Sequence, residues 1–201
     1  MSIYSNFNLP LVLASKSPRR QQLLRDMGFD FTIKTKDTEE SYPDDLPPEE
    51  VPEYLASKKA HALLDDVSNQ TIIASDTIVL LENKILGKPK DYDDAYQMIL
   101  SLSGKTHQVI TGVCLLSKKH KTCFSDTTLV TFRTISKEEI DYYINTCQPF
   151  DKAGAYGIQE WLGMTTIESI EGSYYNVMGL PTHKLYLALL SFQKQQEKSP
   201  F

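Results

Sequence analysis

The sequence predicts a mixed fold of helices and strands, α/β or α+β, on two observations. Short runs rich in Val, Ile and Leu alternate along the chain with segments in which apolar residues recur every three to four positions. Prolines, glycines and capping residues stand where these runs begin and end. Helices and strands interspersed in this way are typical of sheets flanked by helices.

The first third of the chain predicts two strands and two helices. An apolar run indicates a strand over residues 9–15, and apolar residues at helical spacing indicate a helix over residues 18–27. A proline suits the first turn of that helix, and a glycine follows it as a stop. We expect a second strand over residues 29–35, a polar surface loop over residues 36–50 and a helix over residues 52–66.

The middle of the chain predicts a strand that ends in an acid. A β-branched run indicates a strand over residues 71–75, which stops at Asp76. Residues 78–81 and 84–86 are spaced like the two arms of a hairpin. A helix over residues 91–102 follows, capped near its start by an acidic residue.

The last part of the chain predicts two long strands and two helices. The strands are expected over residues 108–116 and 122–135. A serine and a glutamate three positions apart form a capping box at the start of a helix over residues 136–146. A short strand within residues 161–170 and a closing helix over residues 180–193 complete the pattern.

The composition limits the kinds of partner. The 201 residues are 41% hydrophobic and 23% charged, so the chain can bury a core. The net charge of -5 argues against nucleic acid or an anionic membrane as a partner, so an anionic ligand needs a local cluster of cations. The three cysteines form no Cys-x-x-Cys pair, which fits a reduced cytoplasmic compartment. No signal-peptide pattern or run of roughly 18 apolar residues is present, so we expect neither secretion nor membrane insertion.

The stretch LVLASKSPRR places two serines and two arginines at a helix start. Helix N-termini expose unpaired N–H groups that attract anions. Ser15 and Ser17 can donate hydrogen bonds, and the guanidinium groups of Arg19 and Arg20 match phosphate oxygens. The alternative is that Ser17 is an ordinary helix cap and the arginines face water. The stretch alone leaves both interpretations open.

Three further residues are candidates for chemistry. Asp76 follows a buried apolar run, and loops at strand ends favour catalytic groups, although a turn residue that bonds its own backbone is an equal alternative. Lys59 and Lys88 are solvated surface groups unless the fold brings them beside Asp76 and Arg19.

Two glycine-containing segments, DKAGAYGIQ and GSYYNVMGLP, indicate backbone that passes close to a ligand or to another surface. Gln159 in the first segment offers a donor and an acceptor that suit the edge of a base. The chain contains no P-loop, no dinucleotide-binding fingerprint and no zinc-like pairing of histidines.

Six stretches taken in order resemble the Maf family of nucleoside triphosphate pyrophosphatases: LASKSPRRQQLL, LASKKA, SDTIVLLENKILGKP, LSGKTHQVITGV, DKAGAYGIQ and GSYYNVMGLP. The resemblance implies one α/β domain over residues 1–201, similar to the inosine triphosphate pyrophosphatases. It further implies an elongated mixed sheet flanked by helices and a central cleft between two lobes. Within the family, KAGAYGIQ resembles the branch that acts on dTTP and UTP.

The resemblance also implies a reaction and a set of residues. The family cleaves a nucleoside triphosphate between its α and β phosphates with a divalent metal, expected here to be Mg²⁺ or Mn²⁺. Asp76 matches the proposed proton acceptor, and Lys59 and Lys88 are expected to act with it in catalysis. The metal is expected on Asp76 and Glu40. The substrate is expected to contact Ser15, Ser17, Arg19, Arg20, Thr77 and Gln159. Two positions depart from the family pattern: Ser75 replaces the usual alanine, and Glu160 a usual glycine.

Alternatives remain open at this point. Within the family, the substrate is alternatively 7-methyl-GTP or a modified pyrimidine nucleotide. A non-catalytic, septum-linked regulator is the alternative from another class. A homodimer is also open, with the strand over residues 122–135 and the GSYY segment as candidate faces.

Overall fold

The computed structural model of the chain describes residues 7–198. Within them, a seven-stranded mixed sheet has the order β2-β1-β3-β5-β6-β7, and β4 pairs with β3. The strands are β1 (Leu11–Leu13), β2 (Phe31–Ile33), β3 (Thr71–Leu81), β4 (Lys84–Leu86), β5 (Thr106–Leu116), β6 (Lys121–Phe132) and β7 (Ile167–Glu171). The helices are α1 (Pro18–Asp26), α2 (Val51–Ala62), α3 (Tyr92–Leu102), α4 (Lys137–Cys147), α5 (Trp161–Thr166), α6 (Tyr174–Val177) and α7 (Thr182–Glu197). Short 3₁₀ turns lie at Pro48–Glu50, Leu64–Asp66, Pro149–Asp151 and Ala153–Ala155.

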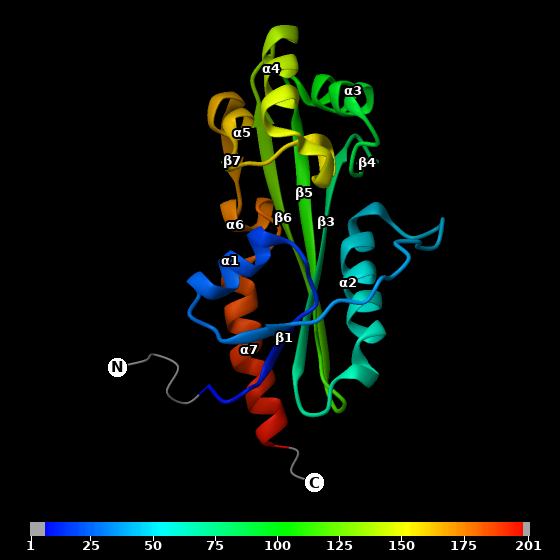
Figure 1. Cartoon of the computed structure of the whole chain (residues 1–201), viewed down its shortest axis with the longest axis vertical. Coiled ribbons are helices and arrows are strands. Elements are labelled where there is room, and N and C mark those ends of the chain that lie inside the picture. The colour runs from blue at the N-terminus through cyan, green and yellow to red at the C-terminus, as the bar shows by residue number, and fades with distance from the viewer. Residues whose placement is uncertain (1–6, 199–201) are drawn as a thin grey trace.

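The molecule is elongated along its three long strands. β3, β5 and β6 run along most of its length, with α1, α2 and α7 around the lower half and α3, α4 and α5 around the upper half (Figure 1). β1 pairs in parallel with β2 and β3, whereas the pairs from β3 to β7 are antiparallel. The predicted α/β class, with an elongated mixed sheet flanked by helices, is confirmed.

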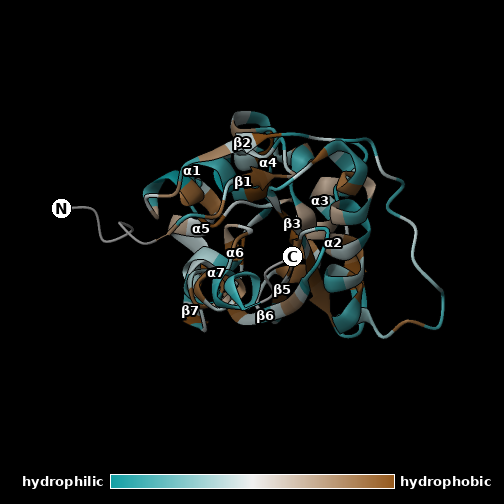
Figure 2. Ribbon diagram, turned by 90° about the horizontal axis from the view of Figure 1, so that it is seen from below, coloured by the Kyte–Doolittle hydropathy of each residue, from teal (hydrophilic) through white to brown (hydrophobic). Residues whose placement is uncertain are grey.

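In the lower half of the sheet, β1 and residues 71–75 of β3 are buried on both faces. Ile73 of β3 belongs to a hydrophobic cluster with α1 and α7, whereas Ile72 and Ala74 belong to a cluster with α2 on the other face. Successive side chains of a strand point to opposite faces, so this alternation is the expected one. Seen from below, the helices lie on both sides of the sheet (Figure 2).

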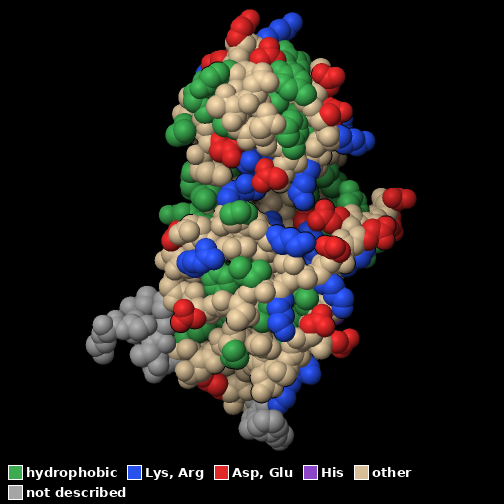
Figure 3. All heavy atoms as spheres, in the orientation of Figure 1, with side chains coloured by type: hydrophobic (Ala, Val, Ile, Leu, Met, Phe, Trp, Pro, Cys, Tyr) green, Lys and Arg blue, Asp and Glu red, His purple; other side chains and the backbone are tan. Residues whose placement is uncertain are grey.

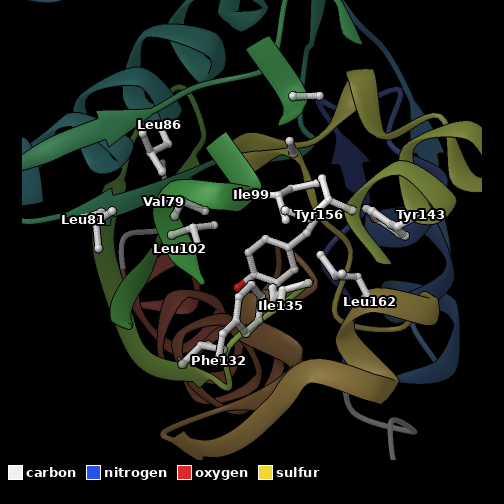
Figure 4. Close-up of a cluster of buried hydrophobic side chains, with 14 of the residues drawn as sticks. Val79, Leu81, Leu86, Ile99, Leu102, Phe132, Ile135, Tyr143, Tyr156 and Leu162 are labelled. Atoms are coloured by element: carbon white, nitrogen blue, oxygen red, sulfur yellow. The ribbon is translucent and has the colours of Figure 1, made fainter. Parts of the chain in front are cut away.

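The upper half has its own core between the sheet and helices α3, α4 and α5. Val79 and Leu81 of β3 contribute to it, together with Phe132 of β6 and the buried Tyr143 and Tyr156 (Figure 4). The two halves therefore bury separate clusters that share the long strands.

One edge of β3 is only partly paired. On that edge, β1 pairs with residues 71–73 and β4 pairs with residues 79–81. On the opposite edge, β5 pairs with residues 72–80 without a break. Within residues 7–198, residues 74–78 therefore have no partner strand on the side of β1 and β4; we call this segment the open edge of β3.

The prediction that a strand stops at Asp76 is wrong. β3 is continuous from Thr71 to Leu81, and Asp76 lies opposite Gly112 of β5. A polar side chain does not interrupt pairing of the backbone, because the hydrogen bonds of a sheet join main-chain groups. Asp76 is thus a residue in the middle of a strand, held by a complete ladder on one side.

The short strand expected within residues 161–170 is confirmed as β7. Two short helices were not expected: α5, which precedes β7, and α6 in the GSYYNVMGLP segment. The predicted helix caps are confirmed: Ser17 accepts from Arg20 N–H, Asp91 accepts from Asp94 N–H, and Ser136 forms the capping box with Glu139. The remaining helices and strands agree with the sequence to within a few residues at their ends.

No helix within residues 7–198 is both long and apolar enough to span a bilayer. The prediction of one domain over residues 1–201 reaches beyond the described residues at both ends, and it stays a prediction.

The buried imidazole of His107 makes the stability of the fold sensitive to pH. His107 lies between the rings of Phe132 and Tyr156, and its Nε2 is 2.8 Å from the Tyr156 hydroxyl. Burial lowers the pKa of His107 from 6.5 to about 4. The unfolded chain therefore takes up a proton at this residue below about pH 6.5, whereas the folded chain does so only near pH 4.

We predict that the free energy of unfolding falls by about 2 kcal/mol between pH 7 and pH 5, because protonation favours the unfolded state in this interval. Urea denaturation at the two pH values measures the change. His107→Phe should remove most of this fall, and the exposed control His183→Gln should keep it. Equal stability of the unchanged protein at both pH values would contradict a buried, neutral His107.

Candidate functional site

A cavity of about 670 Å³ lies against the open edge of β3. Of the described residues that line it, seven are Lys or Arg and four are Asp or Glu, although the whole chain has a net charge of -5. Figure 3 shows positive and negative side chains gathered around a hollow near the middle of the molecule. The cavity is thus the local cluster of cations that an anionic ligand needs.

The first group in the cavity is an acid–lysine–acid bridge on the α2 face of the sheet. Asp76 is two residues from both Ala74 and Ile78 along β3, so its side chain points to the same face of the sheet, where both of them pack. Lys59 of α2 places its Nζ 2.5 Å from Asp76 Oδ1 and 2.7 Å from Glu40 Oε1. Because one ammonium group bridges both carboxylates, α2 and the loop before it are joined to the centre of β3.

A glycine allows α2 to approach so closely. A Cβ at Gly112 of β5 would lie 2.3 Å from the backbone of Pro52 and Glu53, in the first turn of α2. Any side chain larger than hydrogen at this position would push the helix outward. Gly112 is also the partner of Asp76 in the sheet, so the close approach occurs next to the acid.

Glu40 is a carboxylate surrounded by positive charge. Burial raises the pKa of Glu40. The hydrogen bond from Lys59 and the charges of Lys59, Lys88 and Arg20 lower it by more than burial raises it, so the pKa of Glu40 lies below its ordinary value. Lys88 is exposed at the rim of the cavity, on the turn after β4. Glu40 therefore enters the cavity as an anion near neutral pH.

The second group lies on the opposite face of β3, where Thr77 points. Arg20 of α1 donates from Nη2 to Thr77 Oγ1 at 2.9 Å, from Nη1 to the carbonyl of Ser75 at 2.8 Å, and from Nε to the carbonyl of Gly179 at 2.8 Å. Burial lowers the pKa of Arg20 below its ordinary value, and the charge of Asp76 opposes that shift. Arg20 thus joins α1, the open edge of β3 and the segment after α6.

That connection continues into the sheet. Thr77 Oγ1 lies 2.9 Å from Thr111 Oγ1, which donates to the carbonyl of Asn176 at 3.0 Å. The fully buried Asn176 donates from Nδ2 to the carbonyl of Val109 and to Thr128 Oγ1. The GSYYNVMGLP segment is therefore fastened to β5 and β6 by polar groups, and the glycine that follows α6 reaches Arg20.

Arg19 and the two serines occupy the start of α1. Arg19 Nη1 lies 3.3 Å from Asp151 Oδ2, and Asp151 is largely exposed. Ser17 caps the helix, and Ser15 Oγ accepts from Ser17 N–H at 3.2 Å. Both interpretations of the opening stretch are thus partly correct. Ser17 is a helix cap, and both arginines line the cavity. Three of the N–H donors of Arg20, however, bind groups of the protein itself.

The DKAGAYGIQ segment forms the far wall of the cavity. The buried Lys152 lies 2.7 Å from Asp151 Oδ1 and 3.0 Å from Glu160 Oε1. Tyr143 donates its hydroxyl to Glu160 Oε2 at 2.5 Å and accepts from Gly157 N–H at 3.0 Å. These contacts hold the segment from both ends around Gln159.

Gln159 carries an amide oxygen that is buried without a hydrogen-bond partner among the described residues. Buried polar atoms are rarely left unpaired in folded proteins. Since Gln159 lines the cavity, its Oε1 is available to a donor group of a ligand.

The two carboxylates fit a magnesium-type metal. Within residues 7–198 no group of three or more His, Cys, Asp or Glu side chains is arranged to hold a metal by itself. Mg²⁺ is typically bound by one or two carboxylates, with substrate phosphates and waters as further ligands. Asp76 and Glu40, which share contact with one ammonium group, match that smaller set.

All the residues expected to form the site line this one cavity: Ser15, Ser17, Arg19, Arg20, Glu40, Lys59, Asp76, Thr77, Lys88 and Gln159. Sequence analysis missed Asp151, Lys152 and Tyr156, which line the same cavity. Their only local signal is their position beside the glycines of DKAGAYGIQ.

A mixed sheet that carries a cleft with cations around two carboxylates is typical of an α/β enzyme that acts on an anionic substrate. The family described as Maf-like protein matches residues 10–192. The chain belongs to the Maf family.

Relatives about half identical cover most of the chain. A protein of Flavobacterium psychrophilum named dTTP/UTP pyrophosphatase is 49% identical over 92% of this chain and 95% of its own length. A protein of Phocaeicola vulgatus with the same name is 52% identical over 89% of this chain and 94% of its own length. Among solved structures, the Ham1 protein of Staphylococcus aureus aligns with a TM-score of 0.44 at 16% identity, over 61% of this chain and 71% of that one.

The two arginines should differ in their effect on stability. We predict that Arg20→Ala lowers the free energy of unfolding by about 3 kcal/mol, because it leaves the carbonyls of Ser75 and Gly179 without their donor. Arg19→Ala should cost less than about 1 kcal/mol, because its partner Asp151 is exposed. Urea denaturation of both variants measures the difference. Equal losses would show that Arg20 does not join the three segments.

Proposed function

We propose that the protein hydrolyses dTTP and UTP to the nucleoside monophosphate and pyrophosphate. The observation that carries the proposal is that relatives named dTTP/UTP pyrophosphatase are about half identical over about nine tenths of the chain. The cavity on the open edge of β3 supports it, because it combines an acid, several cations and an unpaired amide oxygen.

In the proposed reaction Asp76 positions and deprotonates the attacking water. Asp76 lies in the middle of β3, where pairing with β5 on one side fixes its position, and its side chain reaches the cavity on the open edge. The water attacks the α phosphorus, the bond to the bridging oxygen breaks, and pyrophosphate leaves with the electron pair. The ion pair with Lys59 keeps the carboxylate of Asp76 in place.

The cations of the cavity bind the triphosphate and stabilise the charge that develops on pyrophosphate. Arg19 has a single ion pair with an exposed partner, so its other N–H groups can turn to phosphate oxygens. Lys88 at the rim adds an exposed positive charge. The start of α1, with Ser15 and Ser17, adds hydroxyl and main-chain donors. Positioned cations of this kind supply most of the catalysis of phosphoryl transfer.

We propose Asp76 and Glu40 as ligands of Mg²⁺ or Mn²⁺. When bound, the metal supplies further positive charge to the phosphate oxygens. The binding of a metal by these two residues requires Lys59 to give up at least one of its contacts, which its flexible side chain permits.

Gln159 is proposed to read the base. Uracil and thymine carry an N–H donor between two carbonyl acceptors, and cytosine lacks that donor. The unpaired Oε1 of Gln159 can accept from this N–H, while its amide nitrogen donates to a carbonyl of the base. Lys152, Tyr143 and Glu160 hold the segment and act as positioning residues.

A reduced cytoplasmic location and a homodimer stay predictions. The three free thiols of Cys114, Cys123 and Cys147 support the first.

We predict that Asp76→Asn lowers kcat for dTTP by about 10²–10⁴-fold, because the amide cannot accept a proton from water. Release of pyrophosphate in the presence of Mg²⁺ measures the activity. The fold is checked by thermal melting, and Asp93→Asn on the surface of α3 is the matched control that should keep full activity. Full activity of Asp76→Asn would remove Asp76 from the mechanism, and release of orthophosphate as the first product would overturn the reaction class.

We predict that kcat/KM for dTTP and UTP exceeds that for CTP by at least about 100-fold, because a site built to accept the N–H rejects a base that lacks it. A panel of dTTP, UTP, CTP and 7-methyl-GTP measures the preference. Gln159→Leu should reduce the ratio of kcat/KM for UTP to kcat/KM for CTP, mainly by lowering the value for UTP. If 7-methyl-GTP is the best substrate, the proposed branch of the family is wrong. If no nucleotide of the panel is hydrolysed, the alternative of a non-catalytic regulator is favoured.

A further inference from the structure

Two of the three cysteines face each other across the hairpin of β5 and β6. Cys114 and Cys123 are directly opposite in the register of the two strands, and their sulfur atoms lie 2.7 Å apart. Both are free thiols in this structure. Opposite residues of an antiparallel pair have Cα atoms about 4.5–5.5 Å apart, which lies inside the range of about 4.4–6.8 Å found for disulfides. The backbone therefore already meets the spacing that a disulfide requires.

A second cavity, of about 580 Å³, gives access to one of these thiols. Cys123 lines it and is partly exposed, whereas Cys114 is buried. No residue that lines this second cavity also lines the cleft with Asp76.

Helix α2 separates the two cavities. Val51, Leu55 and Lys59, spaced four residues apart, line the cleft, whereas Glu50, Tyr54 and Ser57 line the second cavity. Residues four apart share one face of a helix, so the two sets lie on different faces. The thiol pair is thus a feature of the protein that the proposed hydrolysis does not use.

The surroundings of the second cavity are acidic. Three acids, Glu49, Glu50 and Glu53, line this cavity. Lys121 is the one Lys or Arg among its described lining residues. An excess of negative charge at the mouth of a cavity raises the local concentration of cations and lowers that of anions. A small cationic reagent is therefore favoured there over an anionic one.

The two thiols differ in reactivity. The hydrogen bond between the sulfur atoms, together with the charge of Lys121, lowers the pKa of Cys123 below its ordinary value, although burial and the charge of Glu53 oppose the shift. The same hydrogen bond and burial raise the pKa of Cys114. Ser57 of α2 contributes a hydrogen bond that lowers the pKa of both. The partly exposed thiol is thus the one that more readily becomes a nucleophile.

We propose that Cys114 and Cys123 are a redox modification site, which a small cationic disulfide converts to an intramolecular disulfide through the second cavity. The Cys123 thiolate attacks one sulfur of the reagent R–S–S–R, so that a mixed disulfide forms and one thiolate leaves. The Cys114 sulfur then attacks Cys123 Sγ, and the second thiolate leaves. The two cysteine thiols are oxidised, the reagent is reduced to two R–SH molecules, and the two protons of the cysteines end on those products.

The test treats the reduced full-length protein with cystamine, a cationic disulfide. The number of free thiols in the denatured protein should fall from three to one, and a peptide map should join Cys114 to Cys123. Cys147, which lies at the end of α4 and packs against the core of the upper half, should stay reduced. Dithiothreitol should restore all three thiols. Three free thiols after treatment, a disulfide that contains Cys147, or a covalent dimer would overturn the proposal.

Matched variants separate the two steps. Cys114→Ala should stop the reaction at the first step, so that Cys123 carries one half of cystamine as a stable mixed disulfide. Cys123→Ala, at the partly exposed position, should leave Cys114 unmodified in the folded protein. Modification of Cys114 in that variant would contradict the order of attack.

Salt tests the access route. Cystamine should react faster than the anionic oxidised glutathione, and its advantage should shrink as NaCl is added, because exposed charges are screened. A rate ratio that does not depend on salt would contradict access through the acidic cavity.

Discussion

The unpaired edge of β3 is the constraint on which the rest of the structure depends. β1 pairs with β3 only as far as Ile73, and β4 ends at Leu86 opposite Val79, so the main-chain groups of residues 74–78 that point to this edge have no partner strand there. Buried main-chain groups need partners. The carbonyl of Ser75 finds one in Arg20, and the space that a neighbouring strand would fill is the cleft. The same gap thus creates both the cavity and the need for a cation in it.

Because successive side chains of β3 point to opposite faces, the polar residues of the site lie on two faces of the sheet. Asp76 points to α2 and meets Lys59, whereas Thr77 points the other way and meets Arg20. Both side chains border one cavity because the strand has no neighbour on that edge. Lys59 of α2 and Arg20 of α1 therefore reach the cavity from opposite faces of β3, and each helix is fixed by its own hydrophobic cluster. In the proposed function this arrangement brings cations to the triphosphate from two sides of the strand that carries the proton acceptor.

The wall that carries Gln159 is held by polar contacts of the neighbouring residue. Glu160 accepts from Tyr143 and pairs with Lys152, so two polar anchors lie next to the residue proposed to read the base. Gly154, with a φ of 68°, packs so closely on β3 that a Cβ would lie 2.8 Å from the Val79 side chain. The wall is thus positioned by burial as well as by ion pairs.

Local signals in the sequence determined the five longer helices, the predicted caps and the long strands β5 and β6, because capping residues, prolines and apolar periodicity act within a few positions. They also marked the segments of the site, and all the expected residues line one cavity. Only the tertiary structure decided that Asp76 lies inside a continuous strand, because the partner that continues the ladder, Gly112, lies 36 positions further along the chain. It likewise decided that Arg20 is bound to Ser75, Thr77 and Gly179, and that Asp151 and Lys152 join the site. Contacts between such distant positions depend on which edges and faces meet, and no local pattern of residues encodes that choice.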